Sequence, residues 1–168
     1  MLPAKLNGVK EIPKPLVDSV VECVKNTIES IVGDRPEYVE SDENGSPMNG
    51  IIGNIAVFNT EHTLSMMIAI PKETALSLSE VFCGMELPFD SDDMGDLVGE
   101  ISNILAGDVA ASIENIGFVG QSSLPTATRG SDLTLFLPNK PPRAKLKFSG
   151  AGGDFWVNLA LSESRRRK

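Results

Sequence analysis

Four residues with polar or bare side chains recur at helical spacing in the second half of the chain: Asp96, Glu100, Asn103 and Gly107. At about 100° per residue, they fall within roughly 60° of one another on one side of a helix. Together they offer two carboxylates, an amide that can both donate and accept hydrogen bonds, and a patch of uncovered backbone. This row predicts a docking face with a chemically competent amide near its centre.

The stretch from Asp90 to Gly117 is predicted to be the long helix that presents this row. Asp90, Ser91, Asp92 and Asp93 suit a helix start, where acids meet the positive end of the helix dipole. Gly117 suits the left-handed backbone conformation that often follows the last residue of a helix. The opposite side of the helix is an apolar stripe, made of Leu97, Val98, Ile101, Ile104, Leu105 and Val109.

A solvated surface without function is the competing interpretation, because most amphipathic helices carry an idle polar face. Gly95, Gly99 and Gly107 weigh against it, since each costs about 1 kcal/mol relative to alanine in a helix interior. Glycines beside the polar row indicate that another body approaches the backbone closely there.

Size and composition predict one soluble globular domain over residues 1–168. The chain has 168 residues, of which 41% are hydrophobic and 23% charged. The basic end, from about residue 162 to 168, is expected to be disordered. A net charge of -8 argues against nucleic-acid binding. Without a signal-peptide pattern or a membrane-length apolar run, we expect a cytoplasmic protein that does not bind membranes.

The sequence offers no other candidate site. Cys23 and Cys83 lie in apolar helical patterns and are expected to be buried, reduced thiols. His62 is expected in a turn without a Cys or His neighbour, which predicts neither a metal site nor a nucleophilic pair. The Gly150–Gly153 run lacks the Lys-Ser/Thr of a phosphate loop and is predicted to be a hairpin turn.

Hydrophobic periodicity predicts an α+β fold, a mainly antiparallel sheet with helices packed on it and the long helix exposed. A first helix is expected from Pro13 to Gly33, and a second from Pro71 to Gly84 with Val81 and Phe82 facing inward. Expected strands are 51–58 and 63–70 as a hairpin, a partly extended 118–124, then 132–137, 144–148 and 154–161. Residues 125–130 are expected to form a loop.

An offset of 78 residues aligns the first helix with the long one. It matches Asp18, Glu22, Lys25 and Pro47 with Asp96, Glu100, Asn103 and Pro125. The match predicts two pseudo-symmetric halves. The first copy lacks the amide, because Lys25 stands in the place of Asn103.

The pattern Asp96-x-x-x-Glu100-x-x-Asn103, followed by Gly107 and Pro125, resembles the signature of the CheC/CheX/FliY family of chemotaxis phosphatases. The preceding run GIIGNIAVFNTEHTLSMMIAIPKETALSLSEVFCGM also resembles that family. The resemblance to the CheX branch is the closer one and extends from the first helix to Leu161. It implies a homodimer joined through its sheets, with a single active site in each chain.

The resemblance also implies a reaction, the dephosphorylation of the phospho-aspartate of a CheY-like receiver domain. Asn103 would orient the attacking water, as glutamine does in GTPases. Glu100 would anchor the partner through the receiver's active-site lysine. Asp96 and Gly107 would contact the partner. The expected cofactor is Mg²⁺ on the receiver, with none on this chain.

Two alternatives remain open. A non-catalytic dimeric adaptor could dock a receiver or a flagellar-switch-like partner through the same face. An adaptor has no reason to prefer an amide at Asn103, which favours the enzyme. A structural dimer with an idle polar helix is the third interpretation.

Overall fold

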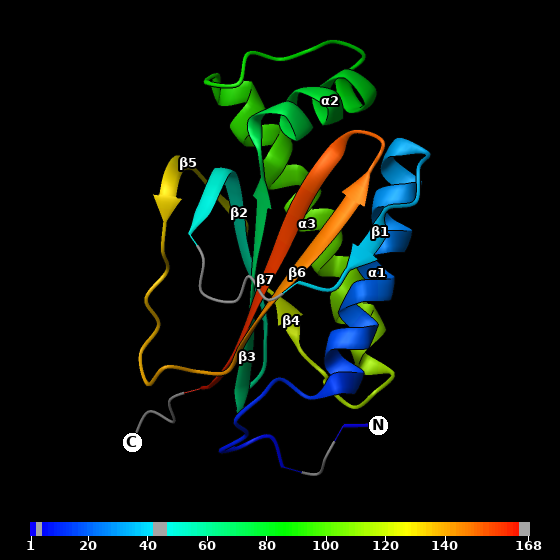
Figure 1. Ribbon diagram of the computed structural model, residues 1–168. Coiled ribbons are helices and arrows are strands. Elements are labelled where there is room, and N and C mark those ends of the chain that lie inside the picture. Colours follow the sequence, from blue (N-terminus) through cyan, green and yellow to red (C-terminus); the bar gives the residue numbers. More distant parts are fainter. Residues whose placement is uncertain (3–4, 42–46, 165–168) are drawn as a thin grey trace.

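The computed structural model describes residues 1–2, 5–41 and 47–164 and shows one sheet with helices packed against it (Figure 1). The helices are α1 (Lys14–Val32), α2 (Lys72–Cys83) and α3 (Asp92–Glu114). The strands are β1 (Glu37–Val39), β2 (Met48–Phe58), β3 (His62–Ile70), β4 (Gln121–Ser122), β5 (Thr126–Leu133), β6 (Arg143–Gly150) and β7 (Gly153–Glu163). The predicted α+β fold is confirmed. The last strand continues to Glu163, and residues 165–168 of the predicted tail lie outside the described residues.

The sheet has a twofold pattern in its strand order, which is β1-β6-β7-β3-β2-β4, with β5 also pairing with β2. The hairpins β2–β3 and β6–β7 meet at the centre through the antiparallel β3–β7 pair. Each hairpin is flanked by a strand of the other half: β1 pairs with β6, and β4 and β5 pair with β2. This exchange confirms the two pseudo-symmetric halves.

The predicted match of Pro47 with Pro125 is wrong as a structural equivalence. Pro47 directly precedes β2, whereas Pro125 lies between β4 and β5, which correspond to β1 in the other half. The helical part of the repeat is the part that the topology supports, because α1 and α3 precede corresponding strands.

Alternation along the long strands builds the core on the side of the sheet that faces α1 and α3 (Figure 1). Leu64, Met66, Ile68 and Ile70 share this side of β3, as predicted, and so do Phe155, Val157, Leu159 and Leu161 of β7. The opposite side of the sheet carries a smaller apolar cluster of Ile52, Met67 and Ala69, with Met48, Leu133, Leu135 and Trp156 beside it.

Strand β5 was predicted in the wrong place. Residues 126–130, expected as a loop, belong to β5, and residues 134–137, expected as a strand, do not. Because β5 lies at the sheet edge and is mostly exposed, its sequence lacks the hydrophobic alternation on which strand prediction depends.

The last turn of α2 also differs from prediction. Val81 and Phe82 are exposed, and so is Cys83, because the side chains that α2 buries lie between Thr74 and Ser79. Cys23 is buried as predicted, and burial raises the pKa of its thiol to about 11. His62 is not in a turn but begins β3, where its imidazole is buried and hydrogen-bonded to Asn7.

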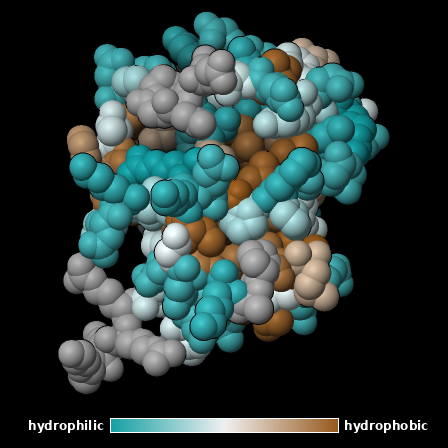
Figure 2. Space-filling model, turned by 60° about the horizontal axis from the view of Figure 1, so that its bottom comes forward, coloured by the Kyte–Doolittle hydropathy of each residue, from teal (hydrophilic) through white to brown (hydrophobic). Residues whose placement is uncertain are grey.

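The lower end of the molecule carries a cavity of about 460 Å³, between the N-terminal segment and residues 138–142. Figure 2 views this end, where hydrophobic surface shows between hydrophilic side chains. Two of its polar side chains are already engaged, since Glu163 accepts a hydrogen bond from the Gly8 N–H at 3.0 Å and His62 contacts Asn7 at 2.8 Å. The polar side chains of this cavity are therefore less available to a ligand than those of the row on α3.

Candidate functional site

Helix α3 carries the predicted row on its exposed side. Its N-cap is Ser91, whose hydroxyl oxygen accepts a hydrogen bond from the Met94 N–H at 3.2 Å. The helix ends three residues before Gly117, which has a left-handed φ of 99°. The row, Asp96, Glu100, Asn103 and Gly107, is exposed throughout. The residues of the predicted apolar stripe are buried, except Ile104, which is half-buried.

A close contact with β2 fixes the height and rotation of α3 over the sheet. Ser102, next to Asn103, is fully buried, and its hydroxyl donates to the Val98 carbonyl at 2.7 Å. A Cβ atom at Gly53 would lie 1.9 Å from the Ser102 Oγ, so only glycine fits below the helix there. Packing at Gly53 thus sets the direction in which Asn103 points.

Helix α1 fixes the other side of α3. The Thr27 hydroxyl donates to the Asp108 carboxylate at 2.7 Å, and the Ser19 and Ser112 hydroxyls lie 2.8 Å apart. Asp108, the residue after the glycine of the row, therefore joins the two helices. The row is thus mounted on a helix held by both neighbouring elements, which limits the motion of Asn103 and Glu100.

The side chains of the row have no partner within the chain as described. Asp96, Glu100 and Asn103 make neither a hydrogen bond nor an ion pair with any described residue. On α1 the matching positions are engaged: Lys14 donates to Asp18 at 2.6 Å, which raises the pKa of Lys14, and Lys25 lies 3.4 Å from Glu22. The two rows match in sequence, but among the described residues the side chains of the row on α3 have no partner, whereas those on α1 do.

A groove of about 630 Å³ lies beside the row, between α3 and β5. Gly95, Asp96 and Gly99 line its helix side, and Thr128 and Arg129 line its strand side. The Arg129 guanidinium donates to the carbonyls of Phe89 and Ser91 at 3.3 and 3.4 Å, which ties β5 to the start of α3. The sequence did not predict this role, because 125–130 reads as a loop. The contacts of Arg129 with Phe89 and Ser91 join residues that are far apart in the sequence, and no local sequence pattern indicates such contacts.

Within the described part of the chain, no three His, Cys, Asp or Glu side chains gather closely enough to hold a metal ion. The described helices also include none with the length and hydrophobicity needed to span a membrane. The polar groups that the row itself offers are the two carboxylates and the amide of α3.

Comparison with known proteins identifies the family. The family model for the chemotaxis phosphatase CheX matches residues 51–149, which is more than half of the chain and includes the whole row on α3. The chain belongs to the CheX family. A comparison with curated proteins gave no match.

Solved structures share the CheX fold over nearly all of their length. The chemotaxis protein CheX from Desulfovibrio desulfuricans has a TM-score of 0.77 and 19% identity, with 88% of this chain and 99% of that chain covered. A chain of the CheX-CheY-BeF3-Mg²⁺ complex from Borrelia burgdorferi has a TM-score of 0.65 and 19% identity, with coverages of 88% and 98%. The FliM middle domain from H. pylori has a TM-score of 0.60 at 10% identity, with coverages of 89% and 92%. At these identities the likeness is one of fold.

Proposed function

We propose that this protein dephosphorylates the phospho-aspartate of a CheY-like receiver domain through the row on α3. The observation that carries the proposal is the state of that row. In a chain of the CheX family, Glu100 and Asn103 are exposed on a firmly held helix and have no partner among the described residues. Side chains that are rigidly mounted and unoccupied are suited to entering the site of another protein.

Asn103 is the water-orienting residue in this proposal. Phosphoryl transfer is mostly positioning plus electrostatics, and an amide can hold a water in line with the departing oxygen. Asn103 can accept from and donate to that water without changing its own protonation state. The water oxygen bonds to phosphorus while the bond from phosphorus to the aspartate oxygen breaks, which gives free aspartate and inorganic phosphate.

Glu100 is the anchoring residue. It precedes Asn103 by nearly one helical turn, and its carboxylate would form a charge-assisted pair with the receiver's active-site lysine. Asp96, one turn earlier on the same side, would add to the docking surface. The metal belongs to the receiver in this proposal, and the B. burgdorferi complex of CheX with CheY also contains Mg²⁺.

Gly107 would let loops of the receiver approach the helix backbone. A Cβ atom added at Gly107 meets nothing within 4 Å, so packing within the described structure does not require glycine there. We therefore expect Gly107→Ala to raise the free energy of unfolding by up to about 1 kcal/mol, by helix propensity. The same variant should bind a receiver more weakly. Chemical denaturation and a binding titration measure the two effects, and a variant that is more stable and binds equally well would contradict the role.

The competing function is a non-catalytic adaptor that docks through the same face. The fold alone does not assign phosphatase chemistry, because the FliM middle domain is similar to this chain as well. Asn103 favours the enzyme, since pure docking would not need an uncharged amide at the centre of the row.

The decisive experiment follows the decay of a phosphorylated receiver domain, with and without this protein, in the presence of Mg²⁺. Faster release of inorganic phosphate supports the phosphatase. Binding of the phosphorylated receiver without faster release supports the adaptor instead. Absence of both binding and faster decay, tested over the host's receiver domains, would leave neither proposal standing.

A homodimer joined through the sheets is part of the proposal, in the cytoplasm where receivers are phosphorylated. The sheet side away from the helices supports it, because Met48, Leu133, Leu135 and Trp156 are only partly buried there, around the cluster of Ile52, Met67 and Ala69 that the chain itself covers. Sedimentation equilibrium should give twice the mass of the 18.0 kDa chain. A single-chain mass at micromolar concentration would contradict the dimer.

A further inference from the structure

The matching row on α1 also carries an aspartate and a glutamate, Asp18 and Glu22, but these carboxylates are bound by side chains of the same chain. The 78-residue offset relates Glu22 to Glu100 and Lys25 to Asn103, and it relates Glu29 to Gly107. The strand order shows that the relation is structural, because α1 and α3 lead into halves that exchange their flanking strands. The two helices thus present equivalent faces in opposite states.

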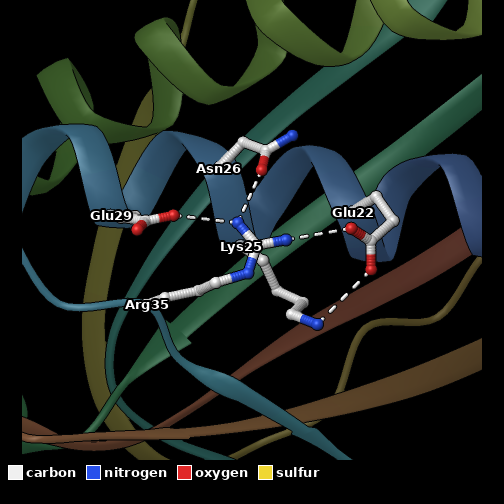
Figure 3. A network of polar contacts seen from close by, with 5 residues as sticks. All are labelled: Glu22, Lys25, Asn26, Glu29 and Arg35. Carbon is white, nitrogen blue, oxygen red and sulfur yellow. Dashed lines mark hydrogen bonds and ion pairs between the residues drawn. The ribbon is translucent and has the colours of Figure 1, made fainter.

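Arg35 is the residue that occupies the α1 face (Figure 3). Its guanidinium donates from Nη2 to Glu22 Oε2 at 2.9 Å, and from Nη1 to Glu29 Oε2 at 2.9 Å and to Asn26 Oδ1 at 2.6 Å. Figure 3 shows these bonds extending along α1, with Lys25 turned to the second oxygen of Glu22. One arginine fork therefore covers two turns of the helix.

The chain after α1 is shaped to return Arg35 over the helix. Gly33 adopts a left-handed φ of 76°, and its N–H donates to the Glu29 carbonyl at 2.8 Å. The Asp34 carboxylate then accepts from the Ala151 N–H at 2.9 Å, in the turn between β6 and β7. Pro36 is buried. With both neighbours of Arg35 fixed, its side chain is directed back toward Glu22.

The second half of the chain lacks this device. Val119 stands two residues before β4, as Arg35 stands two residues before β1, and Val119 is 62% exposed. A valine side chain cannot pair with a carboxylate. Glu100 therefore has no arginine bound to it, whereas Glu22 on the α1 face has one.

We infer that the α1 face is a second docking surface for a basic side chain of a receiver, and that Arg35 occupies it in place of the partner. The inference rests on the proposed function, because the occupant is the same cationic group that Glu100 would anchor. The carboxylate of Glu22, the counterpart of Glu100, matches such a group in charge. A tethered arginine competes at an effective concentration on the order of millimolar, well above the concentration of a free receiver in the micromolar range. Each chain then takes one receiver, on α3.

The test counts the receivers bound per chain. The probe is a purified receiver domain that binds the wild-type protein, activated with beryllofluoride and Mg²⁺, where beryllofluoride stands in for the phosphoryl group. Isothermal titration of the wild-type protein should give one receiver per chain. The Lys25→Asn/Glu29→Gly/Arg35→Ala variant should give two, a twofold rise, because it frees Glu22 and restores both the amide and the glycine of the row.

Controls separate this inference from the proposed function. Arg143→Ala removes the same charge on β6, away from α1, and should leave one receiver per chain. Adding Glu100→Ala to the opened variant should leave about one receiver per chain, bound on α1. If the opened variant folds, as thermal unfolding reports, and still binds one receiver, the inference is wrong while the proposed function stands. If the wild-type protein binds no receiver of its host, the proposed function itself fails.

Discussion

Replacing Asn103 with alanine is expected to remove the acceleration of phospho-receiver decay, by about 10²-fold or more, the usual loss when a positioned polar group at a reaction centre is deleted. The amide would no longer hold the attacking water, while Glu100 would still anchor the partner. Binding should therefore change little and turnover should fall. The measurement is the rate of phosphate release at saturating protein, with affinity titrated separately.

Two variants make the Asn103 result specific. Asn115→Ala removes an exposed amide at the end of the same helix and should keep full activity. Asn103→Asp keeps the shape of the side chain but loses the donor and adds a negative charge beside the phosphoryl group, so it should be as inactive as alanine. Because Asn103 is exposed and has no described partner, neither Asn103→Ala nor Asn103→Asp should lower the unfolding temperature. An alanine variant as active as the wild type would falsify the assignment.

Replacing Glu100 with alanine is expected to weaken receiver binding about 10- to 100-fold, which corresponds to the loss of one charge-assisted hydrogen bond of about 1.5–3 kcal/mol. The loss of affinity should be at least as large as the loss of turnover measured at saturation. A titration of the receiver against wild-type and variant protein measures the first, and single-turnover decay measures the second.

Charge controls decide whether Glu100 acts as an anchor. Glu114→Ala removes the same charge at the other end of α3 and should leave affinity unchanged. A charge exchange, Glu100→Lys here with lysine to glutamate in the receiver's active site, should bind more tightly than either single variant, as expected of a direct pair. Equal affinity of Glu100→Ala and the wild type would remove the anchoring role and leave Asn103 to be tested alone.

The sequence predicted the helix, its row and the family because each depends on local pattern. The 3.6-residue period places Glu100 and Asn103 on one side of α3 whatever surrounds the helix. The alternating strands β3 and β7 were recognised in the same way. The sequence pattern did not predict the edge strand β5, and it predicted that Phe82 in the last turn of α2 is buried. Both predictions were wrong because the surroundings of Arg129 and Phe82 depend on which elements pack beside them.

By itself, the sequence determined that one amphipathic helix carries two carboxylates, an amide and a bare glycine in one row, and that a second helix carries a damaged copy. Only the tertiary structure decided which copy is available. Glu22 and Arg35 are 13 residues apart and meet because Gly33, Asp34 and Pro36 turn the chain back over α1. Gly53 and Ser102 come from different elements, and their contact orients Asn103. Periodicity reports the direction of each side chain on its own helix, whereas occupation of a face depends on contacts that the path of the whole chain creates.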